Sequence, residues 1–161
     1  MDAPFAIDPN DVLAQPTRAR LFALLGELKR PTGTVELAVV GAHLAGEPLH
    51  HQLVELDAVA VAATTTTTDY RLYALAGTEP AKPGLVRVRT GGAAIAVEVY
   101  RLTLEAFGRF VAAVPPPLAI GTVRLASGRD VNGFVCEPVG TEGALDITAF
   151  GGWRSYRASL G

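Results

Sequence analysis

The three histidines of the chain lie within nine positions, where they could transfer protons. His43 comes first and is followed by the adjacent pair His50 and His51. Histidine has an ordinary pKa close to neutral pH, so it can act as a general acid or base. A histidine near the end of a strand is also often a structural residue that only forms hydrogen bonds. Two interpretations therefore stay open, proton transfer and structural support.

The spacing of these histidines does not favour a metal site. Zinc sites usually contain a helical i, i+4 pair with a third ligand, and the nearby acids are only Glu47 and Glu55. The sequence also contains no Walker loop, no Gly-x-Ser-x-Gly elbow and no Gly-x-Gly-x-x-Gly fingerprint. We therefore expect neither a metal nor a cofactor, and we do not expect an NTPase, an α/β-hydrolase or a dinucleotide enzyme.

The segment Val40-Gly41-Ala42-His43-Leu44 is the predicted centre of a small-molecule site. It follows a dense apolar run, and loops placed by a rigid element often line ligand pockets and expose backbone N–H groups. Gly41 permits a sharp turn and a close approach to a ligand. Lys82, between Pro80 and Pro83, is a cation on a stiff loop. It could bind a carboxylate, although an exposed lysine is usually only solvated.

Four other side chains are weaker candidates. Tyr70 and Tyr73 are three positions apart on one predicted strand, so they lie on opposite faces and at most one can face the site. Glu98 interrupts an apolar strand and is either an edge residue or a buried carboxylate with a shifted pKa. Cys136, the single cysteine, is expected to be a small core residue.

The elements that position these residues are predicted from apolar periodicity. Helices are expected at 17–30 with a Thr17 cap, at 49–56, at 104–114 with a Thr103 cap, and from 146 around Trp153. Strands are expected at 35–40, 59–68, 70–75, 85–89, 95–102, 121–125 and 131–136, with hairpins turning at 90–92 and 127–128. Because the helices are scattered among hairpins, we predict an α+β fold, a small mixed β-barrel or sheet with flanking helices.

The composition is that of a folded globular domain. The 161 residues are 49% hydrophobic and 19% charged, with a net charge of −2. This balance offers no electrostatic footprint for nucleic acid or for an anionic membrane. The N-terminus lacks the pattern of a secretory signal, and no apolar run is long enough to span a bilayer. With one cysteine, an internal disulfide is excluded and a cytoplasmic location is expected.

The sequence resembles the C-terminal domain of allophanate hydrolase. The resemblance covers roughly residues 34–157, in order and with few gaps. The segments that carry it are LAVVGAHLAGEPLHHQL (37–53), DYRLYAL (69–75), KPGLVRV (82–88), VEVYRL (97–102), FGRFVAAVPPPLAIGTVRL (107–125), GFVCE (133–137) and DITAFGGWRSY (146–156). Residues 1–33 resemble only the arm and connector helix before that domain, and residues 34–161 are expected to form the domain itself.

This resemblance implies a γ-glutamylcyclotransferase-like fold and a place in urea catabolism. In the whole enzyme an amidase-signature domain converts allophanate to N-carboxycarbamate, and the C-terminal domain takes that product on to carbon dioxide and ammonia. The amidase signature is missing here, so an excised domain and a stand-alone homologue remain alternatives. Cyclotransferases of this fold use a glutamate just after a helix, where this chain has Val111-Ala112-Ala113-Val114-Pro115. Cyclotransferase activity is therefore not expected.

The resemblance also implies roles for individual residues. His43 and His50 become candidates for proton transfer, and Lys82 becomes a candidate for anion binding. The substrate-binding set expected around them is Val40, Gly41, Ala42, Leu44, Tyr73 and Lys82. The expected substrate is a small dicarboxylate or amide, and the protein partners considered are an amidase and a second copy of the chain. A non-catalytic interaction module and a small-carboxylate binding protein remain alternative functions.

Overall fold

The computed structural model describes residues 14–28 and 33–161, and the contacts of the chain divide it into two units between residues 32 and 33. In the first unit, α1 (Ala14–Leu28) begins three residues before Thr17, so the predicted cap at Thr17 is wrong. The side chains of Leu21 and Leu24 are more than half exposed. Residues 1–16 are expected from the sequence to form an irregular arm or a short helical turn, and residues 14–16 belong to α1. Residues 1–13 and the predicted end of the helix at 29–30 lie outside the described residues.

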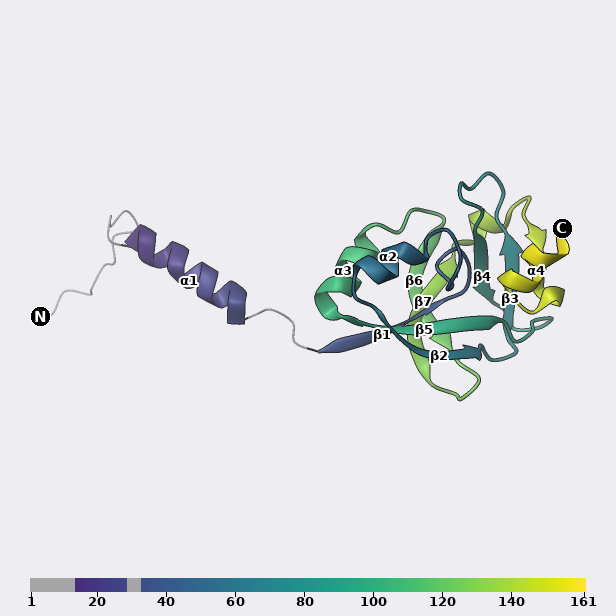
Figure 1. Ribbon diagram of the computed structural model, residues 1–161, viewed down its shortest axis with the longest axis horizontal. Coiled ribbons are helices and arrows are strands. Elements are labelled where there is room, and N and C mark those ends of the chain that lie inside the picture. The colour runs from purple at the N-terminus through teal and green to yellow at the C-terminus, as the bar shows by residue number, and fades with distance from the viewer. Residues whose placement is uncertain (1–13, 29–32) are drawn as a thin grey trace, which may run out of the picture. The chain divides into compact units, whose positions relative to one another are not determined.

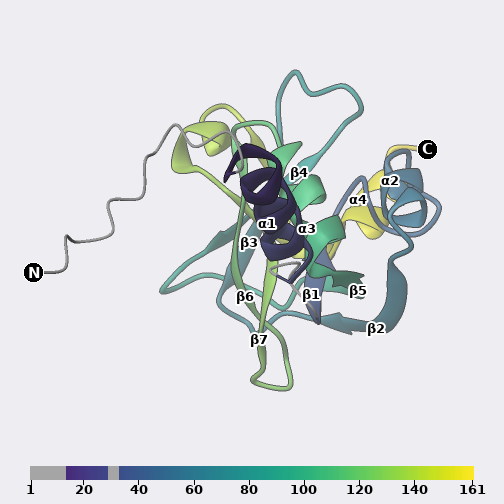
Figure 2. The same ribbon diagram turned by 90° about the vertical axis from the view of Figure 1, so that its left-hand side faces the viewer.

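A five-stranded sheet forms the main body of the second unit (Figure 1). Its strands, in spatial order, are β2 (Val59–Thr65), β5 (Ala96–Thr103), β1 (Thr34–Val39), β7 (Asp130–Cys136) and β6 (Leu118–Arg124). All neighbours are antiparallel except β1 and β7, which run parallel. The predicted hairpin of β6 and β7 is confirmed, and the two strands run side by side in both views (Figures 1 and 2). The central β1 carries the predicted site segment at its end.

The two edge strands of this sheet approach each other at one end. Thr66, just after β2, pairs with Leu125, just after β6, and the Thr67 N–H donates to the Arg124 carbonyl. Thr66 is fully buried, and its Oγ1 accepts a hydrogen bond from the Ile95 N–H. The sheet is therefore curled, and the strands of the described residues form two sheets and not one closed barrel.

The second sheet has three strands, in the order β4 (Pro83–Arg87), β3 (Tyr70–Ala74) and β8 (Leu145–Asp146). The predicted hairpin between 85–89 and 95–102 is therefore wrong. Gly91 and Gly92 do lie at a turn, but the Ala93 N–H donates to the Tyr70 carbonyl and β5 then joins the other sheet. A glycine turn marks where a strand ends, whereas the partner of the next strand is decided by tertiary packing.

Three short helices flank the sheets of the second unit. They are α2 (His50–Glu55), α3 (Leu104–Ala112) and α4 (Trp153–Ser159), with 3₁₀ turns at Pro138–Thr141 and Thr148–Phe150. The C-terminal helix begins at Trp153 and not at Asp146, which belongs to β8. The mixed α+β fold predicted from the sequence is confirmed. Among the described residues, no helix combines the length and the apolar character that a membrane-spanning segment requires.

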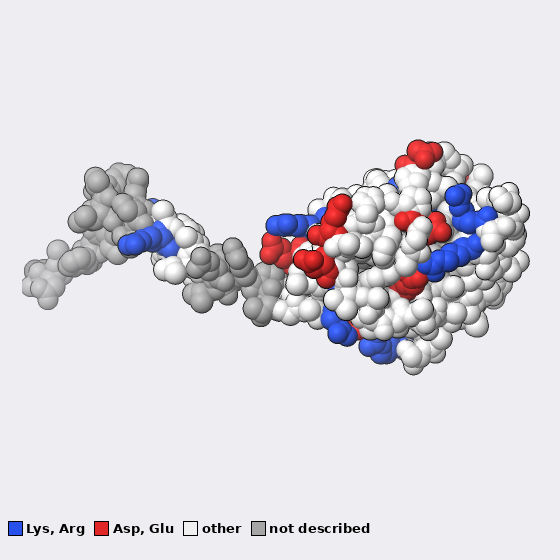
Figure 3. Space-filling model, in the orientation of Figure 1, with Lys and Arg blue, Asp and Glu red and all other residues white. Residues whose placement is uncertain are grey.

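One buried core joins the elements of the second unit. Its largest fully buried side chains are Trp153, Tyr70, Leu37, Leu53, Leu72, Leu85, Ile95, Leu102 and Ile147. Cys136 is 7% exposed, as expected for a small core residue. On the face shown in Figure 3, acidic and basic side chains of this unit are interspersed.

Thr103 caps α3, as predicted, because its Oγ1 accepts a hydrogen bond from the Ala106 N–H at 3.1 Å. Thr103→Ala is therefore expected to lower the free energy of unfolding by about 1 kcal/mol, the usual cost of losing such a cap. Thr103→Ser keeps the hydroxyl and is expected to stay close to the wild type. Urea denaturation measures both, and an equal loss in the two variants would contradict the capping role.

Candidate active site

The loop that follows β1 is closed by its own backbone hydrogen bonds. The Leu44 N–H donates to the Gly41 carbonyl, and the Leu49 N–H donates to the Ala42 carbonyl, at 2.9 and 2.8 Å. A Cβ on Gly41 would lie 2.2 Å from Cδ of Pro83, so only glycine fits this contact. The close approach predicted for Gly41 is therefore made by a proline of the chain itself, the first residue of β4.

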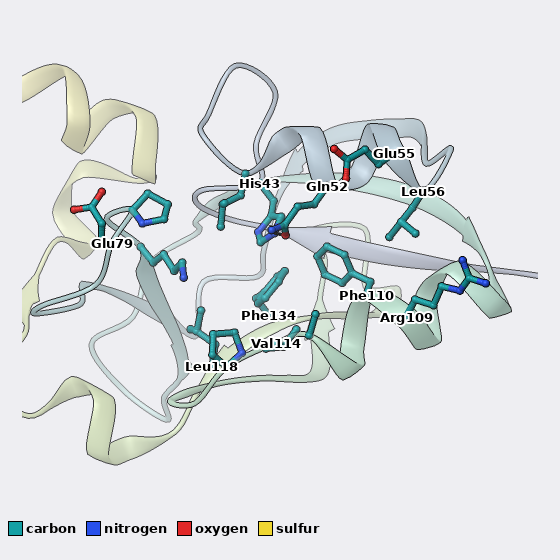
Figure 4. Close-up of a pocket in the computed structure, with 15 residues that line it drawn as sticks. His43, Gln52, Glu55, Leu56, Glu79, Arg109, Phe110, Val114, Leu118 and Phe134 are labelled. Carbon is teal, nitrogen blue, oxygen red and sulfur yellow. Dashed lines mark hydrogen bonds between the residues drawn. The ribbon is translucent and has the colours of Figure 1, made fainter.

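A cavity of about 410 Å³ opens beside this loop (Figure 4). Its apolar walls come from α3 and the residues after it, from β6 and β7, and from the ends of α2. The lining residues are His43, Leu49, Gln52, Glu55, Leu56, Glu79, Pro80, Lys82, Arg109, Phe110, Ala113, Val114, Pro115, Leu118 and Phe134. Cavities of this size and polarity are typical of small-molecule sites.

His43 stands at the wall of this cavity among aromatic rings. Its imidazole stacks on Phe134 at 5.1 Å between ring centroids and meets the edge of Phe110 at 5.0 Å. Its Nε2 donates a hydrogen bond to Oε1 of Gln52 at 2.8 Å, an arrangement in which Nε2 carries the proton. Within the described ranges, the other ring nitrogen, Nδ1, has no hydrogen-bond partner. It therefore keeps a lone pair that can take up a proton.

The environment of His43 favours its neutral form. Burial lowers the pKa of His43 below its ordinary value, and the hydrogen bond to Gln52 opposes this only in part. The positive charge of Lys82 lowers the pKa further, because it disfavours a second cation nearby. Among the described residues Lys82 takes part in none of the ion pairs, so its charge remains available to an anion in the cavity.

The other two histidines are placed differently. His50 begins α2, and its Nδ1 donates to the His43 carbonyl at 3.0 Å. His51 is exposed, and its Nδ1 donates to the Pro48 carbonyl at 2.9 Å. Neither lines the cavity that contains His43. The structure thus brings His43 and Lys82 together, and it places His50 behind the loop as a support for the His43 backbone.

The predicted substrate-binding residues fall into three groups. Val40, Gly41, Ala42 and Lys82 line a recess of about 20 Å³ beside His43. Leu44 is buried and faces a different cavity of about 400 Å³, which Trp153 also lines. Tyr73 lies in β3 opposite Gly84 and lines none of these cavities. Tyr70, on the same strand, is fully buried. Among residues 14–28 and 33–161, no three His, Cys, Asp or Glu side chains are grouped as a metal site requires.

Several residues of the site were not identified from the sequence. Gln52, which fixes the tautomer of His43, lies nine positions later on α2 and belongs to no recognisable pattern. Phe110 and Phe134 read only as core residues of a helix and a strand. The sequence marks Glu98 as an unusual carboxylate, and in the structure it accepts a hydrogen bond from the Ala45 N–H at 2.8 Å. An acid inside an apolar strand is the one sequence feature that could have indicated a residue in contact with this loop.

Lys82→Met is expected to raise the pKa of His43, because it removes a positive charge that disfavours the imidazolium. It is also expected to weaken the binding of malonate, a small dicarboxylate, by about tenfold or more, since a hydrogen bond to a charged group is lost. Arg89→Met removes an exposed cation that does not line the cavity and serves as the control. NMR titration and calorimetry measure the two effects. Equal results for both variants would exclude Lys82 as the anion-binding residue.

The fold and the site define a small α+β domain in which a half-buried neutral imidazole and a lysine share the wall of one apolar cavity. Residues 35–158 match the family model of the allophanate hydrolase C-terminal domain. The chain is 45% identical over 137 residues to a urea amidolyase of Saccharomyces cerevisiae, an alignment that covers 83% of this chain and 8% of that protein. The chain therefore belongs to the allophanate hydrolase C-terminal domain family.

Solved structures agree with this family. The allophanate hydrolase of Kluyveromyces lactis matches with a TM-score of 0.77 and 47% identity, over 80% of this chain and 22% of that chain. The protein c4763, described as specific to uropathogenic E. coli, matches with a TM-score of 0.73 and 34% identity, over 78% of this chain and 97% of that chain. The chain thus spans a small part of the amidolyase and hydrolase relatives and nearly all of c4763.

Proposed function

We propose that this domain performs the second step of allophanate breakdown within urea degradation, converting N-carboxycarbamate to carbon dioxide and ammonia in the cytoplasm. The observation that carries the proposal is the position of His43, with a free Nδ1 and a lowered pKa, on the same cavity wall as Lys82. The family and the names of the relatives, urea amidolyase and allophanate hydrolase, support the choice of substrate.

The reaction requires two proton transfers to nitrogen. N-carboxycarbamate is a dianion with two carboxylates on one N–H group. When that nitrogen takes up a proton, one C–N bond breaks and leaves carbon dioxide and carbamate. A second proton on the carbamate nitrogen breaks the other C–N bond and leaves carbon dioxide and ammonia. A group that delivers protons near neutral pH is therefore the central requirement, and an imidazole supplies it.

His43 can become that proton donor when the dianion binds. Alone, the imidazole is neutral, because burial and Lys82 lower its pKa. Two negative charges beside it raise the pKa, since an opposite charge favours the imidazolium. Binding would then draw a proton onto Nδ1, and Lys82 would hold one carboxylate. The apolar walls at Phe110 and Phe134 favour release of neutral carbon dioxide over retention of a charged carboxylate.

The test follows carbon dioxide release from N-carboxycarbamate that a separate amidase generates from allophanate. The wild-type chain is expected to accelerate release above the spontaneous rate, and His43→Ala is expected to abolish the gain. His51→Ala is the matched control, because His51 is exposed and lies outside the cavity lining. If the wild-type chain leaves the spontaneous rate unchanged, the proposed function is wrong.

A non-catalytic interaction module is the second candidate, and α1 is the observation that favours it. Its side chains Leu21, Phe22, Leu24 and Leu25 are 53%, 67%, 55% and 37% exposed, which is unusual for a run of large apolar residues. The occupants considered are an amidase and a second copy of this chain. Light scattering distinguishes them, and a strictly monomeric chain with no affinity for an amidase would argue against both.

A small-carboxylate binding protein is the remaining alternative, favoured by the same cation and cavity. It would bind malonate and show a higher melting temperature in its presence, but it would release no carbon dioxide. The two measurements together separate this function from the proposed reaction.

A further inference from the structure

Both carboxylate oxygens of Glu98 accept hydrogen bonds, and Glu98 does not line the His43 cavity. It lies on β5, and its side chain is 15% exposed. Its Oε2 accepts hydrogen bonds from the Ala45 N–H and the Tyr100 hydroxyl, both at 2.8 Å. Burial raises the pKa of Glu98, but the hydrogen bonds from Ala45, Arg154 and Tyr100 together outweigh it and leave the pKa below its ordinary value. Glu98 is therefore ionised at neutral pH.

Arg154 completes this arrangement from the other end of the chain. It lies in α4, and its Nη2 donates to Oε1 of Glu98 at 2.8 Å and to the carbonyl oxygen of Ala45. Both polar groups of the Ala45 backbone are thus bound by charged side chains, the N–H by Glu98 and the carbonyl by Arg154. Hydrogen bonds to charged groups are stronger than neutral ones, so these bonds restrain the loop backbone at Ala45.

Ala45 is two residues after His43 in the same tight loop. His43 itself is held by two hydrogen bonds, one from its ring to Gln52 and one from His50 to its carbonyl. The hydrogen bonds at Ala45 hold the backbone on the other side of His43, in addition to the backbone hydrogen bonds within the loop. A shift of the imidazole by about 1 Å can reduce a catalytic rate by about a hundredfold.

We propose that Glu98 and Arg154 are positioning residues for His43, which act by fixing both polar groups of the Ala45 backbone. The inference rests on the proposed function, in which His43 transfers the proton, and it assigns no contact with substrate to either residue. Glu98 and Arg154 line the separate cavity that Leu44 faces, on the other side of the loop from His43. The alternative is that the pair only anchors α4 to the sheet.

The experiment compares Arg154→Ala with Arg124→Ala. Arg124 forms a similar exposed ion pair with Asp130 on the β6–β7 hairpin and does not touch the loop. In Arg154→Ala, malonate binding is expected to weaken about tenfold, and the pKa of His43 from NMR titration is expected to move toward its ordinary value as the ring loosens. Arg124→Ala is expected to leave both unchanged. Arg154→Lys keeps one donor and should recover part of the loss.

Glu98→Gln provides a second variant if Arg154→Ala does not fold. Its side-chain oxygen can still accept from Ala45, but it no longer attracts Arg154, so the same changes in a smaller degree are expected. Unchanged malonate affinity and an unchanged His43 titration in the folded variants would overturn the positioning role, whatever happens to the melting temperature. If the wild-type chain binds no malonate and releases no carbon dioxide, the proposed function fails, and the His43 titration still decides the positioning.

Discussion

Gly41→Ala is expected to lower the free energy of unfolding by about 1–3 kcal/mol, the usual cost of overpacking a dense site. The new methyl group would lie 2.2 and 2.4 Å from two ring carbons of Pro83, and a proline ring cannot turn away. Either β4 or the His43 loop must move. Malonate binding is therefore expected to weaken by about tenfold or more, because His43 and Lys82 would no longer share their present geometry.

The matched control is Gly108→Ala, the same substitution on the exposed face of α3. A Cβ there meets no atom within 4 Å, so no clash arises. Alanine favours a helix over glycine, and the variant is expected to gain about 0.5–1 kcal/mol. Urea denaturation of both variants, with malonate calorimetry, measures the contrast. If Gly41→Ala were as stable as the wild type, the contact with Pro83 could not be a constraint on the loop.

Malonate binding at pH 7 is expected to take up as much as one proton per molecule bound, and His43→Ala is expected to take up none. In the free chain burial and the charge of Lys82 lower the pKa of His43 below its ordinary value, so the imidazole is neutral at pH 7. A bound dianion raises this pKa. Between the free and the bound pKa each binding event carries a proton with it, so the affinity falls as the pH rises, by up to about tenfold per pH unit.

Calorimetry in buffers of different ionisation enthalpy counts these protons. The measurement is made above the pH range in which malonate itself titrates. His51→Ala should take up as many protons as the wild type, because His51 is exposed and bound only to the Pro48 carbonyl. Equal uptake in the wild type and His43→Ala would show that another group receives the proton, and His43 would lose its assigned role.

The loop that carries His43 could be located from the sequence, but the contacts that hold it in place could not. A dense apolar run followed by Gly41 and His43 indicated where the loop would lie, and the structure brings His43 and Lys82 to one cavity. The partners of the loop were hidden because they come from distant positions. Gln52, Glu98 and Arg154 bind it through hydrogen bonds that no local pattern encodes.

The fold shows the same division between local and distant information. Alternating apolar residues indicated the strands, and Ser127-Gly128 correctly indicated the hairpin of β6 and β7, whose partners are adjacent in sequence. At Gly91 and Gly92 the same reasoning was wrong, because β4 pairs with β3 and β5 lies between β1 and β2. Turn residues report a change of direction, and they carry no information about which sheet the chain enters next.

The hydrogen bond from Arg154 to Ala45 joins residues that are 109 positions apart, so on the ribosome it can form only late in synthesis. The glycine–histidine loop leaves the exit tunnel early, whereas the guanidinium that binds it is made much later. Until residue 154 has emerged, the Ala45 carbonyl lacks the partner that it has in the folded chain. A nascent chain can therefore assemble much of its sheet before this loop is held, and the loop around His43 reaches its final restraint only when α4 docks.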